Sequence, residues 1–227
     1  MRALPHLLYR SLRYRKPTMS ELVQGLYRLQ KRDAPRAGMV LAEAFRDDPV
    51  WSRVFVEDYQ HIKRIGGWFE GAVRYCMKYG EVYAPSQKLE GVVNIIAGEF
   101  SDLNMWRMLR SGSIKASLRM GLSLSIHAAR MRAVFLPLEA DRRAHMQGRP
   151  YLYIMTLGVD PSEQGKGYGS QLIEAAISLA KEKDQPIYLE TETKQNVAMY
   201  ERHGFKVVKK ITLPMINQPM WEMIREG

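Results

Sequence analysis

The spacing of apolar residues along this chain changes several times, and each change predicts an element of secondary structure. Loose alternation over 22–29 predicts a strand. Asp33 as an N-cap and Pro35 in the first turn predict that a helix follows at once. Helical spacing over 57–79, ended by Gly80, predicts a long amphipathic helix. The first part of the chain is therefore expected to begin as strand and helix.

Strand patterns become frequent after Gly80. Short apolar runs at 81–84 and 91–97 predict a hairpin. Residues 151–159 are apolar on both faces, as in a central strand, and 167–183 follow with helical spacing. The remaining expected elements are a strand at 187–191, a short helix at 196–203 and a strand pair at 205–213 and 220–224. This order of elements indicates an α/β protein.

A basic, helical segment at 102–146 separates the hairpin from the central strand, and its pattern is clearest over 114–134. Residues 101–143 contain eight basic and three acidic side chains, and residues 1–38 contain nine basic and two acidic side chains. The net charge of these two segments together is therefore larger than that of the whole chain, which is +10. Such an excess favours an anionic ligand or solvated arginine-rich faces. Neither segment has a zinc pattern or aromatic residues interleaved on a strand, so nucleic-acid binding is disfavoured.

The composition is that of one domain with a full core, since the chain has 227 residues of which 46% are hydrophobic. Cys76, the single cysteine, cannot form an internal disulfide, and its place in a helical pattern predicts a core thiol. No run approaches the roughly 18 apolar residues that a membrane-spanning helix needs. Residues 1–20 contain no acidic side chain, so we expect a basic extension there, either a targeting leader or a surface helix.

A glycine-rich turn joins the central strand to the next helix, with the sequence Gln164-Gly165-Lys166-Gly167-Tyr168-Gly169. It is not a Walker loop, because no Ser or Thr follows the lysine. It is not a Rossmann fingerprint, because that motif belongs to the first strand–helix unit of a domain. Small residues at such a turn let backbone N–H groups approach a pyrophosphate at the N-terminus of the helix. The turn therefore predicts a pyrophosphate site.

Two segments of the last third, GVDPSEQGKGYGSQLI and LETETKQNVAMYERHGFKVV, follow one another in a set order. They resemble the acetyl-coenzyme A binding core of the GNAT N-acetyltransferase superfamily. Its Gln/Arg-x-x-Gly-x-Gly/Ala signature is matched by Gln164, Gly167 and Gly169. Its Asn-x-x-x-Tyr-x-x-x-Gly-Phe pattern is matched by Asn196, Tyr200, Gly204 and Phe205. The stretches LAEAFRDDPVW and YLYIMTLGVDP also resemble the branch that includes puromycin N-acetyltransferase.

The resemblance implies the GNAT fold, an α/β (α+β) arrangement with a central mixed twisted sheet of six or seven strands flanked by helices. The sheet is expected to be splayed between its fourth and fifth strands. The domain is expected to span 21–227, with 102–146 as a helical insertion and 1–20 as a basic N-terminal extension.

The resemblance further implies acetyl-CoA as cosubstrate and no metal. Leu157, Gly158 and Val159 would form the splayed, bulged end of the central strand, whose freed backbone groups pair with the pantetheine arm as an added strand does. The pyrophosphate would be bound by the turn residues Gln164, Gly165, Lys166, Gly167, Tyr168, Gly169 and Ser170. Lys166 can equally be a solvated turn lysine. Asn196 would orient the pantetheine, and its alternative role is a helix cap.

Transfer of an acetyl group to an amine requires a proton acceptor for the amine and a proton donor for the departing thiolate. Tyr200 fits the donor role, with simple packing as its alternative. For the acceptor we select Glu190, while Glu99 and Glu192 stay open because they also come from expected strand ends. The two histidines of the basic segment, His127 and His145, are expected on the surface.

The expected function is transfer of acetyl from acetyl-CoA to a primary amine of a small molecule. Two alternatives stay open: a non-catalytic acetyl-CoA-binding module that engages a macromolecule, and a protein N-acetyltransferase. The basic insertion is expected to cover the acceptor pocket and to favour acceptors that carry a carboxylate or phosphate. We expect a cytoplasmic protein, or one of an organelle matrix if the extension is a leader, and keep a homodimer open.

Overall fold

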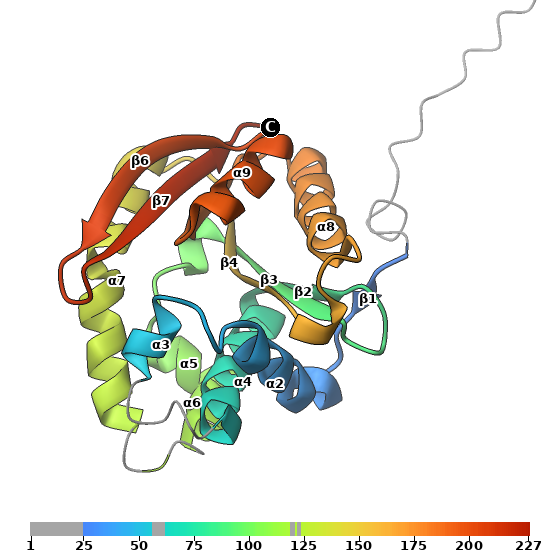
Figure 1. Cartoon of the computed structure of the whole chain (residues 1–227), viewed down its shortest axis with the longest axis vertical. Coiled ribbons are helices and arrows are strands. Elements are labelled where there is room, and N and C mark those ends of the chain that lie inside the picture. The colour runs from blue at the N-terminus through green and yellow to red at the C-terminus, as the bar shows by residue number, and fades with distance from the viewer. Residues whose placement is uncertain (1–24, 56–61, 119–120, 122–123) are drawn as a thin grey trace, which may run out of the picture.

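The computed structural model describes residues 25–55, 62–118, 121 and 124–227. The expected extension at 1–20, and the beginnings of the elements expected at 22–29 and 57–79, lie outside these ranges. One seven-stranded sheet runs through the molecule in the order β1-β2-β3-β4-β5-β7-β6 (Figure 1). Its strands are β1 (Tyr27–Arg28), β2 (Gly80–Ala84), β3 (Gly91–Ala97), β4 (Leu152–Val159), β5 (Ile187–Thr191), β6 (Lys206–Leu213) and β7 (Gln218–Arg225).

The helices cover both faces of the sheet (Figure 1). They are α2 (Ala34–Ala44), α3 (Trp51–Val54), α4 (Ile62–Tyr79), α5 (Met105–Ser111), α6 (Ser113–Ser117), α7 (Leu124–Met146), α8 (Tyr168–Lys183) and α9 (Lys194–Arg202). Asp33 is the N-cap residue of α2, as expected, but its carboxylate instead binds the Tyr27 hydroxyl and the backbone N–H of Gln30.

Alternation along the central strands creates two cores. On β3, Val92 and Ile96 belong to the cluster formed with α2 and α4, whereas Val93 and Ile95 belong to the cluster formed with α8. A strand that is buried on both faces needs this continuous apolar run, which is why the expected hairpin and central strand could be read from the sequence. Cys76 is fully buried in the first core, as predicted, and burial raises the pKa of its thiol.

The sheet is mixed, and its one parallel pair is short. β4 and β5 pair only at Leu152 with Ile187 and at Tyr153 with Tyr188. All other neighbouring strands are antiparallel. Beyond Tyr153 the fourth and fifth strands therefore diverge, which confirms the expected splay.

The segment 102–146 is helical, as predicted, but it divides into α5, α6 and α7. The expectation of surface histidines in it was wrong. His127 is completely buried, and its Nδ1 lies 3.1 Å from the carbonyl oxygen of Val54. The side chain of His145 is 25% exposed and contacts Glu222. Both rings face the body of the protein because α7 packs Val134 and Leu138 into the first core.

Candidate active site

The divergence of β4 and β5 opens a cleft with a volume of about 80 Å³. One wall consists of aromatic rings from the segment around α3 and from α7, namely Phe45, Trp51 and Phe135. The facing wall consists of strand residues and of two side chains from α9. The cleft is lined by Phe45, Val50, Trp51, Phe135, Tyr153, Ile154, Met155, Thr156, Leu157, Leu189, Glu190, Thr191, Glu192, Asn196, Tyr200 and Met220.

A β-bulge shapes the β4 side of the cleft. The register with β3 runs from Asn94 opposite Thr156 to Ile95 opposite Ile154, so Met155 is the extra residue. One inserted residue reverses the alternation of side chains along a strand. Gly158 consequently faces α2, where an added Cβ would lie 2.9 Å from the Cβ of Ala44. The bulge was expected at 157–159 and lies slightly earlier, and Gly158 allows the close approach of α2.

The glycine turn lies beyond the end of β4 and leads into α8. Gly165 and Gly167 have φ angles of +78° and +86°, which only glycine adopts without strain. Gly167 is the N-cap residue of α8, and Tyr168, Gly169 and Ser170 form its first turn. The turn thus presents backbone N–H groups at a helix N-terminus, the arrangement that binds phosphate groups. None of its residues lines the cleft itself.

Three side chains of the turn are engaged with the protein, and one of them is Ser170, whose Oγ lies 3.2 Å from His203 Nε2. The Gln164 amide donates to the carbonyl oxygen of Val159 at 3.3 Å. Lys166 is exposed and forms an ion pair with Glu163 at 2.7 Å, and the hydrogen bond to Glu163 raises the pKa of its ammonium group. Lys166 therefore matches the solvated-lysine alternative, with its charge already paired.

Helix α9 contributes Asn196 and Tyr200 to the cleft. The N-cap of α9 is Thr193, whose hydroxyl accepts from the backbone N–H of Asn196, so the capping alternative for Asn196 is wrong. The Asn196 amide instead donates to Glu192 Oε1 at 2.9 Å. Tyr200 is 7% exposed, and its ring packs against Phe205. Burial and the nearby Glu192 raise the pKa of the Tyr200 hydroxyl, so it keeps its proton.

Glu192 lines the cleft, and its carboxyl group is hydrogen-bonded to that of Asp48, which does not itself line the cleft. Asp48 also accepts from the backbone N–H groups of Val50 at 2.8 Å and Trp51 at 3.0 Å. Burial, with the Asp48 carboxylate beside it, raises the pKa of Glu192 to about 9. Burial also raises the pKa of Asp48. Two adjacent carboxyl groups cannot both ionise at low cost, so the pair holds a shared proton near neutral pH.

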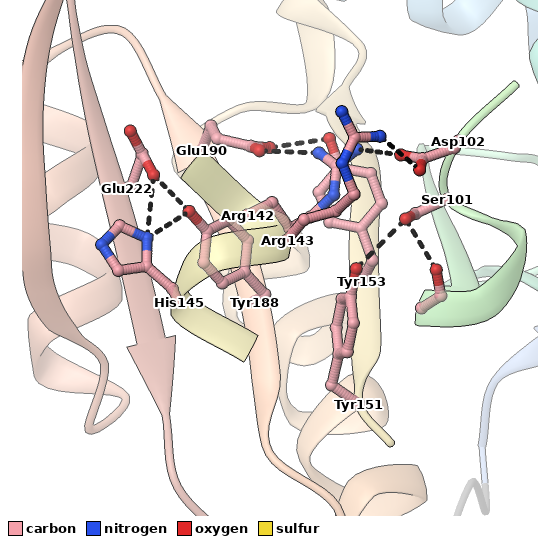
Figure 2. A network of polar contacts seen from close by, with 11 residues as sticks. Ser101, Asp102, Arg142, Arg143, His145, Tyr151, Tyr153, Tyr188, Glu190 and Glu222 are labelled. Carbon is pink, nitrogen blue, oxygen red and sulfur yellow. Dashed lines mark hydrogen bonds and ion pairs between the residues drawn. The ribbon is translucent and has the colours of Figure 1, made fainter. Parts of the chain in front are cut away.

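Glu190 has quite different partners, which Figure 2 shows. Arg142 of α7 donates to its Oε1 at 2.8 Å, and the Tyr153 hydroxyl donates to its Oε2 at 2.7 Å. The Arg142 guanidinium also lies over the Tyr153 ring, 4.3 Å from its centroid, and contacts Asp102. Burial raises the pKa of Glu190, and Arg142 opposes that shift. Both oxygens of this carboxylate are therefore occupied by donors.

Comparison with known proteins agrees with this geometry. Residues 134–205 match the Acetyltransferase (GNAT) family. An uncharacterised N-acetyltransferase of Schizosaccharomyces pombe is 29% identical over 217 residues, which cover 88% of this chain and 82% of that protein.

Two solved structures have the same fold. A histone acetyltransferase HPA2-related protein of Corynebacterium glutamicum has a TM-score of 0.58 at 19% identity, covering 89% of this chain and 95% of that one. Arylalkylamine N-acetyltransferase 2 of Aedes aegypti has a TM-score of 0.55 at 14% identity, covering 88% and 97%.

The chain is similar to GNAT-family acetyltransferases over residues 134–205 and in its fold. The expected GNAT fold is thereby confirmed, and acetyl-CoA is the cosubstrate that this family uses. The resemblance to the puromycin N-acetyltransferase branch stays a prediction. Within the described ranges, no group of three or more His, Cys, Asp or Glu side chains could hold a metal ion.

The remaining sequence candidates of the acetyltransferase lie away from the cleft. Glu99 is exposed in a short turn after β3 and does not line it. Two basic side chains of the insertion are directed elsewhere, since Arg107 lies over Phe100 and Arg143 pairs with Asp102. Arg142, in contrast, binds the cleft residue Glu190. The only charged side chains among the described cleft residues are acidic.

One residue of the acetyltransferase site, Asp48, was missed in the sequence. It stands in the stretch LAEAFRDDPVW, which carried part of the family resemblance but suggested no chemistry. The signal that could have found it is a pair of acidic residues directly before Pro49 and Trp51, in a loop between two helical patterns. A loop carboxylate followed by an aromatic residue is common, so only the fold shows that it meets Glu192.

Proposed function

We propose that this acetyltransferase transfers the acetyl group of acetyl-CoA to the primary amine of a small molecule by direct attack, inside the cleft between β4 and β5. One observation carries the proposal. Glu192, which shares a proton with Asp48, and Tyr200 both line one small cleft at the point where the sheet is splayed. A proton acceptor and a proton donor thus border the same reaction space.

The residues beside the cleft fit the cosubstrate. The splay leaves the backbone groups of Leu157, Gly158 and Val159 without strand partners on the β5 side, where a pantetheine arm can pair with them. The turn from Gln164 to Ser170 would bind the pyrophosphate through backbone N–H groups and the positive end of α8. When acetyl-CoA is bound, its thioester supplies an activated acetyl group, and the sulfur of coenzyme A departs as a thiolate.

The two proton transfers are assigned to residues of the chain. The Asp48–Glu192 pair carries one negative charge and accepts a proton from the attacking nitrogen. Tyr200 donates to the departing sulfur, since its raised pKa keeps its proton in place at neutral pH. Asn196 holds Glu192 in position through their hydrogen bond. Glu190, the base expected from the sequence, is a weaker candidate because Arg142 and Tyr153 bind both of its oxygens.

The lining of the cleft favours a particular kind of acceptor. Phe45, Trp51 and Phe135 present rings, and the charged lining residues are Glu190 and Glu192. Aromatic faces and carboxylates attract an ammonium group attached to an apolar or aromatic body. We therefore propose such an amine in place of the carboxylate- or phosphate-bearing acceptor that the charge of the insertion suggested.

The test is a turnover assay that detects free thiol in the presence of acetyl-CoA and a panel of amines. Arylalkylamines, amino acids, polyamines and peptides with a free N-terminus would be compared. We expect the highest kcat/KM for a compact apolar or aromatic amine. Binding of acetyl-CoA without turnover on any amine would favour the non-catalytic module, and turnover on peptides alone would favour a protein N-acetyltransferase.

A further inference from the structure

A cluster of large apolar side chains is exposed on and just before α5. Leu103 is 52% exposed, Met105 72%, Trp106 64% and Leu109 56%. We call these four residues the α5 patch. None of them lines the cleft. Contiguous exposed apolar groups of this size mark surfaces that bind something.

The α5 patch is held in a fixed shape. Asn104 caps α5 by accepting from the backbone N–H groups of Trp106 and Arg107 at 2.9 and 3.3 Å. Met105 and Leu109 are four residues apart, and Trp106 lies three residues before Leu109, so the three side chains project from one face of the helix.

The opposite side of α5 faces the protein. The Arg107 guanidinium lies over the Phe100 ring, 4.9 Å from its centroid, and donates to the Glu99 carbonyl oxygen at 3.1 Å. Met108 packs against the first core. Because α5 is anchored in this way, it cannot rotate to bury the patch in its own domain.

Basic side chains outnumber acidic ones around the α5 patch, where Asp102 directly precedes Leu103 and is paired with Arg142 and Arg143. Arg110 is exposed and lies four residues after Trp106, and Lys115 of α6 is exposed as well. The sequence from 103 to 138 contains six basic residues and no acidic residue. An apolar face with Trp, Met and Leu beside basic side chains is the composition of segments that lie in the interface of an anionic membrane.

We infer that the α5 patch docks this acetyltransferase on an anionic lipid surface. Trp106, Met105 and Leu109 enter the boundary between headgroups and acyl chains, and Arg110 and Lys115 contact lipid phosphates. Charge decides between this occupant and a second copy of the chain, because two copies meeting at the patch would bring basic residues against each other. No helix in the described part of the chain is long and apolar enough to span a membrane, so the contact is interfacial.

The test uses the full chain and vesicles of phosphatidylcholine with or without an equal share of phosphatidylserine. Cosedimentation measures binding, and the fluorescence of Trp106, the most exposed of the four tryptophans, reports insertion. We expect binding to the anionic vesicles, a blue shift of the emission and weaker binding at high salt. Binding to neutral vesicles should be much weaker.

Matched variants distinguish binding through the α5 patch from nonspecific adsorption of the protein to vesicles. The double substitution Trp106→Ser with Leu109→Ser should lower vesicle affinity about tenfold or more. Removing Arg110 or Lys115 by substitution to Gln should lower it about fivefold each. The controls are Val207→Ser with Val208→Ser, two exposed apolar residues of β6, and Lys206→Gln on the same strand. The controls should bind as the parent chain does, and all variants should keep turnover on a soluble amine.

Three results would overturn the inference. The first is absence of binding to anionic vesicles at physiological salt. The second is equal loss of binding in the β6 controls and the α5 variants. The third is self-association in sedimentation velocity that the Trp106 and Leu109 substitutions abolish, which would assign the patch to a second copy.

Discussion

Glu190 lies on β5 and Glu192 directly after its end, and both line the same cleft, yet their surroundings are opposite. Glu190 faces an arginine and a tyrosine hydroxyl that occupy both of its oxygens. Glu192 faces another carboxyl group and the amide of Asn196. Two positions at the end of β5 therefore place one carboxylate in a compensated ion pair and the other in a proton-sharing pair.

The difference teaches which role each carboxylate can take. A buried carboxylate with a matched cation is stable as an ion, and breaking such a pair is costly. A buried carboxyl pair with one shared proton sits close to a change of protonation state, which general catalysis requires. We therefore assign Glu190 to holding α7 on the sheet, together with the Glu222–Tyr188–His145 cluster beside it (Figure 2), and Glu192 to chemistry.

The largest expected effect comes from removing the cation of the compensated pair. Arg142→Met leaves Glu190 buried without its partner and should lower the free energy of unfolding by about 3–5 kcal/mol. The matched control is Arg143→Met, because Arg143 is exposed and pairs with the exposed Asp102, so its loss should cost about 0–1 kcal/mol. Chemical denaturation measures both. Equal, small losses would show that the Arg142–Glu190 pair does not anchor α7.

The next effect concerns the proton donor opposite Glu192. Tyr200→Phe keeps the ring packed against Phe205 and removes only the hydroxyl. The kcat for the best amine should fall roughly 10²-fold, with little change in the affinity for acetyl-CoA. Tyr83→Phe is a suitable control, since Tyr83 is also buried but lies outside the cleft. Unchanged kcat in the Tyr200 variant would reduce this residue to a packing role.

A smaller effect should appear in the pH dependence of stability. The pKa of Glu192 is raised from 4.5 to about 9, so below pH 4.5 both the folded and the unfolded chain hold its proton. Between these values the unfolded chain loses the proton and the folded chain keeps it, so this group lowers the free energy of unfolding as pH rises. Glu192→Gln keeps the neutral form at every pH.

The loss of stability between pH 5 and pH 8.5 should therefore be smaller in Glu192→Gln than in the parent chain, by at least about 1 kcal/mol, since one pKa unit corresponds to about 1.4 kcal/mol. Denaturation at the two pH values gives the difference. A parent chain and variant with parallel pH profiles would mean that Glu192 is ionised in the fold, contrary to a shared proton with Asp48.

Much of the fold could be predicted from the sequence because its signals are local. The apolar run of β4, the positive-φ glycines Gly165 and Gly167, and the helical spacing of α8 each reflect a short-range constraint. The family motifs added the splay between β4 and β5. The position of the bulge at Met155 could not be predicted, since it depends on register with β3.

The candidate site was harder to predict because its electrostatics depend on residues far apart in the chain. Glu190 meets Arg142 of α7, which the sequence suggested only as part of a basic insertion over the acceptor. Glu192 meets Asp48, which lies 144 positions earlier. Neither pairing produces a periodic pattern in the sequence. The prediction that His127 lies on the surface was wrong for the same reason. In the sequence, a buried histidine whose ring contacts the Val54 carbonyl oxygen has the same pattern as an exposed polar residue.

The most direct test of these assignments is the pH dependence of kcat/KM for the best amine in Glu192→Gln and Glu190→Gln, beside the parent chain. We expect Glu192→Gln to end the proton sharing, to lower kcat/KM roughly 10²-fold and to move the rise of activity to lower pH, because Asp48 without a carboxyl neighbour ionises more easily. Glu190→Gln should keep the shape of the profile and show its main effect in stability. The reverse outcome, a changed pH dependence in Glu190→Gln and a near-parental profile in Glu192→Gln, would make Glu190 the base and contradict the role given to the Asp48–Glu192 pair.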